Sequence, residues 1–170
     1  MPPPFVPKRV EDIIYYYYAK LVIAPSAGFE RNYGFIIDTY KRLKSGEVEM
    51  SHYDREIEHV AKAADECAFC GSRSKNCQPV HVVPRSLGIP PGMHNLVIAC
   101  ENCAQSKQDK DLMYWWCKEL GKPRDDVPRI PLGLYLKIAY EMNRINFSLR
   151  KKCNGLAQVF DHVKRQNKTK

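Results

Sequence analysis

Apolar side chains recur at the three-to-four-residue spacing of an amphipathic helix in several stretches of the chain. Before residue 65 this spacing predicts three helices, over residues 10–23, 31–44 and about 51–64. Pro25 follows the first pattern and is expected to end that helix. After a proline-rich connector, the same spacing predicts a last helix across residues 134–145.

The middle of the chain has a different pattern. Two short apolar runs, Pro79 to Val83 and Asn95 to Ala99, have the length of strands, and a Gly/Pro-rich turn lies between them. A polar helix is expected to start near Glu101 and to reach about Leu120. These patterns predict an α+β fold, a mainly helical chain with a central ββα module. Its expected parts are an N-terminal helical region (1–64), the ββα module (65–121) and a C-terminal helical extension with a basic tail (122–170).

Four of the seven cysteines form two Cys-x-x-Cys pairs, Cys67 with Cys70 and Cys100 with Cys103. Two such pairs can supply four thiolates to one tetrahedral zinc ion, which leaves no open position for water. We therefore predict a structural zinc site that staples the module. Disulfides are not expected from an odd number of cysteines, and this pattern predicts a soluble, intracellular protein in a reducing but otherwise unknown compartment.

The chain is basic, with 27 Lys and Arg against 19 Asp and Glu and a net charge of +8. A positive surface attracts polyanions, and nucleic acid is the polyanion that soluble proteins meet most often. The alternative is a solvated basic surface without a specific partner. No apolar stretch is long enough to span a bilayer, so no membrane partner is expected.

Between the cysteine pairs lie His81-Val-Val-Pro-Arg-Ser86 and Asn95-Leu-Val97. The order of Cys-x-x-Cys-Gly, these two motifs and the second Cys-x-x-Cys resembles the HNH nuclease family, whose hairpin-and-helix unit is often stapled by two zinc knuckles. The resemblance covers residues 67 to about 111, a quarter of the chain. It implies an HNH-like ββα fold and a metal-dependent endonuclease that hydrolyses phosphodiester bonds, with DNA expected ahead of RNA.

The resemblance also implies roles for single residues. His81 matches the histidine that acts as general base on the attacking water, and a neutral imidazole suits that task near pH 7. Asn95 matches the asparagine that holds the loop carrying this histidine. Arg85, Lys107 and Lys110 are expected at nucleic-acid phosphates. The catalytic ion of such an enzyme would be Mg²⁺ or Mn²⁺.

Two positions depart from the family's pattern. Val80 stands where an aspartate usually binds the catalytic ion, and Ala104 stands where an asparagine or histidine usually completes its coordination. Neither side chain can ligate a cation, and His94 is the best replacement ligand that the sequence offers. Two alternatives therefore remain: an inactive HNH-fold protein that binds nucleic acid, and a structural component of a complex with protein partners at Tyr114–Trp116.

Overall fold

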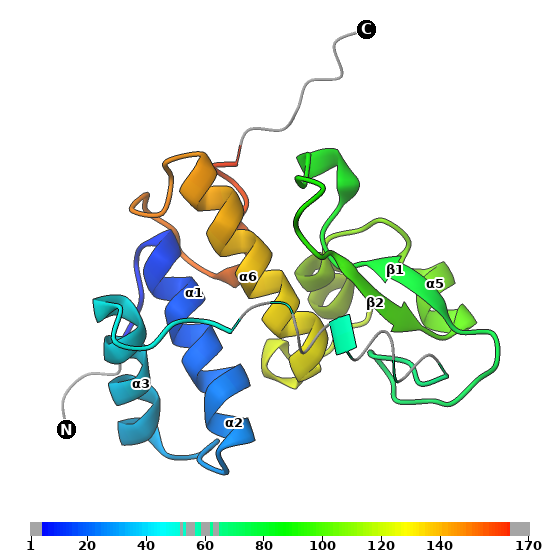
Figure 1. The fold of residues 1–170 in the computed structure, drawn as a ribbon, viewed down its shortest axis with the longest axis horizontal. Helices are drawn as coiled ribbons and strands as arrows, with labels where there is room; N and C mark the ends of the chain where they lie inside the picture. The colour runs from blue at the N-terminus through cyan, green and yellow to red at the C-terminus, as the bar shows by residue number, and fades with distance from the viewer. Residues whose placement is uncertain (1–4, 52, 54–56, 59–61, 63–64, 164–170) are drawn as a thin grey trace, which may run out of the picture. The chain divides into compact units, whose positions relative to one another are not determined.

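The computed structural model describes residues 5–51, 53, 57–58, 62 and 65–163. The fold is α+β, with helices and a two-stranded antiparallel sheet (Figure 1). Contacts divide the chain into two compact units, one of residues 1–50 and 139–163 and one of residues 51–138 and 164–170. The helix expected over about 51–64 falls largely outside the described residues.

The first unit begins with a helical stretch that changes its hydrogen-bond pattern twice. Helix α1 (Val10–Tyr18) continues into a π-helical turn (Ala19–Ile23) and then into α2 (Ala24–Ser26). Pro25 was expected to end the helix, yet the helix passes through it and ends before Gly28, whose φ of 77° suits glycine. Proline has no N–H to donate, and here it follows directly on a wider π-helical turn.

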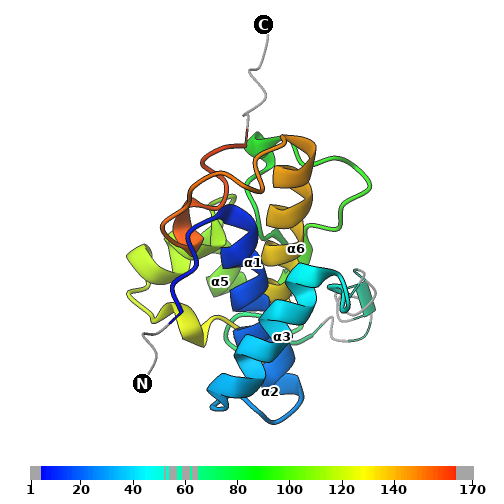
Figure 2. The ribbon, with the colours of Figure 1, turned by 90° about the vertical axis from the view of Figure 1, so that its left-hand side faces the viewer.

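Helix α3 (Tyr33–Ser45) packs against α1 and the π-helical turn that follows it (Figure 2). Its first turn is capped by Asn32, whose Oδ1 accepts a hydrogen bond from the Phe35 N–H at 2.9 Å. At its other end Gly46 adopts a left-handed conformation with φ 80°. The expected helix over 31–44 is therefore confirmed, with its ends shifted by one or two residues.

A buried carboxylate links α1 to α3. Asp12 Oδ1 accepts hydrogen bonds from the Tyr40 hydroxyl at 2.9 Å and from Lys44 Nζ at 2.8 Å. Burial, followed by the hydrogen bond to Asp12, raises the pKa of Tyr40 to about 12. The two bonds partner a carboxylate that is only 8% exposed.

The last long helix, α6 (Arg129–Ile145), starts earlier than its apolar spacing predicts, because Pro131 lies in its first turn, where a missing N–H is tolerated. Its last residue, Ile145, is 46% exposed. After α6 the chain returns to the N-terminal segment: the Val10 N–H donates to the Lys151 carbonyl, and the Cys153 N–H to the Lys8 carbonyl. Cys153 is buried.

The second unit contains the sheet. Strand β1 (Gln78–His81) pairs with β2 (Leu96–Ala99), and His81 lies opposite Leu96. Helix α5 (Glu101–Lys107) packs against both strands. Among the described residues, 3₁₀ turns span Arg85–Leu87, Arg124–Asp126 and Leu156–Gln158.

The prediction of a single helix from Glu101 to about Leu120 is wrong, because the helical conformation is interrupted after α5. Gln108 has a φ of 52° and a ψ of −142°, which no helix accommodates. Helical structure resumes beyond Asp111, whose Oδ1 accepts hydrogen bonds from two backbone N–H groups, and a π-helical segment spans Tyr114–Glu119. Asp111 Oδ2 also accepts a hydrogen bond from Tyr135 at 3.0 Å.

The tryptophans after this break belong to the core of the second unit. Trp115 and Trp116 are 1% and 3% exposed, and the Trp115 ring meets Phe69 edge-on at 5.0 Å. Of the three residues Tyr114–Trp116, only Tyr114 is therefore exposed enough to contact a protein partner. None of the helices in the described part of the chain has the length and apolar character needed to cross a membrane.

Candidate functional site

The four cysteines of the two Cys-x-x-Cys pairs lie together, with all four sulfur atoms within 4.8 Å of one another. Cys70 Sγ lies 3.8 Å from Cys100 Sγ. A tetrahedral zinc ion with Zn–S bonds of about 2.3 Å places its sulfur ligands about 3.8 Å apart. The cluster could therefore hold a metal ion such as zinc. Among the described residues, no other group of three or more Cys, His, Asp or Glu side chains lies close enough to hold a metal.

Local backbone structure brings each cysteine pair into place. In the first pair the Gly71 N–H donates to the Cys67 carbonyl at 2.9 Å, and the φ of 73° at Gly71 disfavours any other residue. The Ala68 N–H donates to the Ile98 carbonyl and so fixes this turn to β2. In the second pair Cys100 occupies the N-cap of α5, which places Cys103 in the first turn of that helix.

The thiols differ in their acidity. The Ser72 hydroxyl, 3.1 Å from Cys70 Sγ, lowers the pKa of Cys70 to about 6. Burial, together with the neighbouring sulfur atoms, raises the pKa of Cys103. Like charges at this spacing repel, so a cation is needed to hold all four groups as thiolates.

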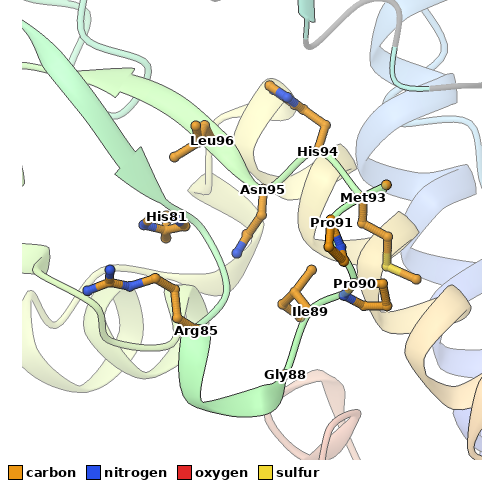
Figure 3. Close-up of a pocket in the computed structure, with 11 residues that line it drawn as sticks. His81, Arg85, Gly88, Ile89, Pro90, Pro91, Met93, His94, Asn95 and Leu96 are labelled. Atoms are coloured by element: carbon orange, nitrogen blue, oxygen red, sulfur yellow. The ribbon is translucent and has the colours of Figure 1, made fainter.

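A second feature of this unit is an open pocket of about 970 Å³ next to the sheet (Figure 3). Its polar side contains His81 and Arg85, and its other side is largely apolar, with Ile89, Pro90 and Met93. Burial lowers the pKa of His81, and the nearby positive charge of Arg85 adds to this effect. This shift favours the neutral imidazole, in a pocket that solvent can reach.

One side chain fixes the loop that follows β1. Asn95 Oδ1 accepts a hydrogen bond from the Val83 N–H at 2.9 Å, and Asn95 Nδ2 donates to the Val83 carbonyl at 2.8 Å. The Val82 N–H donates to the backbone carbonyl of Asn95. The side-chain amide of Asn95 thus binds the backbone of Val83 through both its oxygen and its nitrogen, and so ties down the loop between His81 and Arg85.

The three basic residues expected at phosphates lie in different surroundings. Arg85 lines the pocket, with its side chain 70% exposed and 3.5 Å from the Asp109 carboxylate. Lys110 pairs with Glu119 at 2.8 Å. Lys107 is fully buried, and its ammonium donates to the carbonyls of His81 and Lys110. Lys107 therefore supports the backbone, and the expectation that it contacts phosphate is corrected.

The remaining candidates do not gather around His81. The His94 ring points away from His81 (Figure 3), and its Nε2 has no hydrogen-bond partner among the described residues. Val80 and Ala104 are each 7% exposed and fill the core. Asp109 acts on His81 electrostatically, but its carboxylate accepts the Arg85 N–H and pairs with its guanidinium. Among the described residues, no cluster of three or more Cys, His, Asp or Glu side chains includes His81.

Sequence reasoning did not assign a role to Asp109 as the partner of Arg85. The sequence pattern gave only a weak indication of this pairing, since a single aspartate after a helix is common and the pairing depends on the break at Gln108.

No family model matches the chain, and no curated protein or solved structure matches it.

Proposed function

We propose that residues 65–121 form an HNH-type endonuclease module that hydrolyses phosphodiester bonds, with DNA expected ahead of RNA. The proposal is supported mainly by one juxtaposition: the neutral imidazole of His81 and the exposed guanidinium of Arg85 line one open pocket. A neutral imidazole can take a proton from an attacking water, and a guanidinium can bind two phosphate oxygens. Asn95 holds the loop that joins the two residues.

The metal requirement of this activity is open to experiment. A divalent ion stabilises the negative charge that develops on phosphate during hydrolysis. Because no cluster of three or more Cys, His, Asp or Glu side chains among the described residues includes His81, we assign no step to such an ion. Zinc at the four cysteines has no open position, so its role in the proposed enzyme is structural.

Plasmid nicking in the presence of Mg²⁺ or Mn²⁺ tests the proposal. The unmodified chain should nick supercoiled DNA, and His81→Ala should abolish nicking while zinc content and DNA binding stay unchanged, because a general base acts only in the chemical step. Arg85→Ala should weaken both binding and nicking. His162→Ala, which changes an exposed histidine outside the module, is the matched control and should leave the rate unchanged.

A second candidate function is nucleic-acid binding without cleavage. It is favoured by Val80 and Ala104, which occupy the two usual ligand positions as buried apolar side chains. Under this proposal the unmodified chain binds DNA with a strong salt dependence but nicks nothing. The double substitution Val80→Asp with Ala104→Asn then creates nicking activity, provided that the variant still folds, which circular dichroism would check.

A further inference from the structure

Helix α6 ends in a Schellman motif with an unusual residue at its left-handed position. The Ser148 N–H donates to the Asn143 carbonyl at 2.9 Å, and the Phe147 N–H donates to the Arg144 carbonyl at 3.2 Å. This pair of bonds requires the intervening residue to adopt a positive φ, and Phe147 has a φ of 55°. Glycine usually occupies this position because a side chain there is strained.

Buried hydrogen bonds hold the strained conformation in place. Ser148 Oγ donates to Asn143 Oδ1 at 2.6 Å, and Asn143 Nδ2 donates to the carbonyls of Val159 and Ala139. Asn143 and Ser148 are 0% and 2% exposed. The chain after α6 is therefore anchored on both sides of Phe147, and the direction of its side chain is fixed.

This fixed side chain points into solvent. Phe147 is 94% exposed, the highest value among the large apolar side chains of the described residues. Its ring thus adds nothing to the core, although its backbone conformation opposes folding. A strained and exposed aromatic residue on a rigid support is typical of a contact with a partner outside the fold.

The charge beside Phe147 identifies the partner's chemistry. Three exposed cations follow it in sequence, Arg150, Lys151 and Lys152, and none of them forms an ion pair with another described residue. Arg144, one turn before, pairs with Glu141. An exposed ring followed in sequence by three exposed cations, which pair with no described residue, suits a partner that carries both flat apolar groups and repeated negative charges.

We propose that Phe147 and the basic run of residues 150–152 form a contact for single-stranded nucleic acid. In this contact the phenyl ring stacks on an unpaired base, and the three cations hold the adjacent phosphates. The site belongs to the unit of residues 1–50 and 139–163, whereas the residues that line the pocket at His81 belong to the other unit. It requires no cleavage and is tested by binding alone.

Replacing Phe147 with glycine tests the proposal, because stability and binding should change in opposite directions. Phe147→Gly removes the strain at positive φ, so Tm should rise by about 2–4 °C. The same change removes base stacking, so affinity for a labelled single-stranded oligonucleotide should fall at least about fivefold. Tyr114→Ala is the matched control: it removes another exposed aromatic side chain, 54% exposed, and should leave the affinity unchanged.

The fluorescence of a Phe147→Trp variant identifies the partner directly, after subtraction of the signal from the unmodified chain. A single-stranded oligonucleotide should quench the new fluorescence, whereas vesicles of phosphatidylcholine and phosphatidylserine should not shift it. The proposal would be overturned if the oligonucleotide did not quench this fluorescence, or if the vesicles shifted it to shorter wavelength. Equal oligonucleotide affinity of the Phe147→Gly variant and the unmodified chain would overturn it as well. Nicking that depends on His81 is measured separately, so the two proposals can fail independently.

Discussion

Lys107 Nζ donates a hydrogen bond to the backbone carbonyl of His81 at 2.5 Å and thereby ties the end of helix α5 to the strand that carries the histidine. The same ammonium donates to the Lys110 carbonyl at 2.6 Å, across the break after the helix. One buried side chain thus links the end of strand β1 to the backbone that follows helix α5. The position of His81 depends on it.

Lys107→Ala is therefore expected to destabilise the second unit by about 3 kcal/mol, since it leaves a cavity and two buried carbonyls without their donor. Urea unfolding followed by tryptophan fluorescence measures this change, because Trp115 and Trp116 lie in the same unit. Lys118→Ala removes an exposed lysine nearby and should change stability very little. Equal midpoints for the two variants would contradict the role of Lys107.

The pH dependence of stability should also depend on Lys107. Burial lowers the pKa of Lys107 to about 8 from 10.5, so between these values the unfolded chain binds the proton that the folded chain has released. Stability rises with pH wherever the unfolded state binds more protons, so Lys107 contributes a positive slope from about pH 8 upward. The stability of the unmodified chain relative to Lys107→Met should accordingly increase from pH 8 to pH 9.5. A difference that stays constant over this range would show that the lysine is not titrating there.

The pKa of His81 should rise when the charge of Arg85 is removed. Burial lowers this pKa most, and the charge of Arg85 lowers it further, so Arg85→Gln should move the pKa upward. If cleavage depends on neutral His81, the acidic limb of the pH–activity profile should then shift to higher pH in this variant. A histidine NMR titration measures the pKa whether or not the protein cleaves DNA. Lys118→Gln, which removes a charge elsewhere, should leave the His81 titration unchanged.

One metal ion per chain is expected at the four cysteines, and its removal should unfold the module of residues 65–121. Elemental analysis of the purified protein should give one zinc, and a chelator should reduce the protection of the β1 and β2 amides in hydrogen exchange. Cys100→Ser should have the same effect, whereas Cys117→Ser, outside the cluster, should retain the metal. A folded Cys100→Ser variant that still binds zinc would contradict the four-cysteine site.

What could be read from the sequence was local. The Cys-x-x-Cys spacing and Gly71 define the cysteine turns, and the two apolar runs lie within a residue or two of the observed strands. The break at Gln108 could not be predicted, because neither glycine nor proline marks it and a side-chain hydrogen bond from Lys107 to the Lys110 carbonyl spans it. Lys107 was expected at phosphate because the resemblance includes a lysine four residues after the second Cys-x-x-Cys pair, whereas lysine is in fact buried here, which is rare. Its hydrogen bond to the His81 carbonyl depends on the tertiary fold, which the sequence pattern does not reveal.

Residues 8–11 form backbone hydrogen bonds with residues 149–153, and residues 51–138, the part of the second unit that contains the cysteines and the sheet, are inserted in the sequence between these two segments. During synthesis the N-terminal segment therefore leaves the ribosome long before its partner exists. The inserted unit is complete earlier, with its cysteines and sheet within one continuous stretch. Vectorial folding should consequently begin with the metal-binding unit, and the helices at the start of the chain should gain their final stability last.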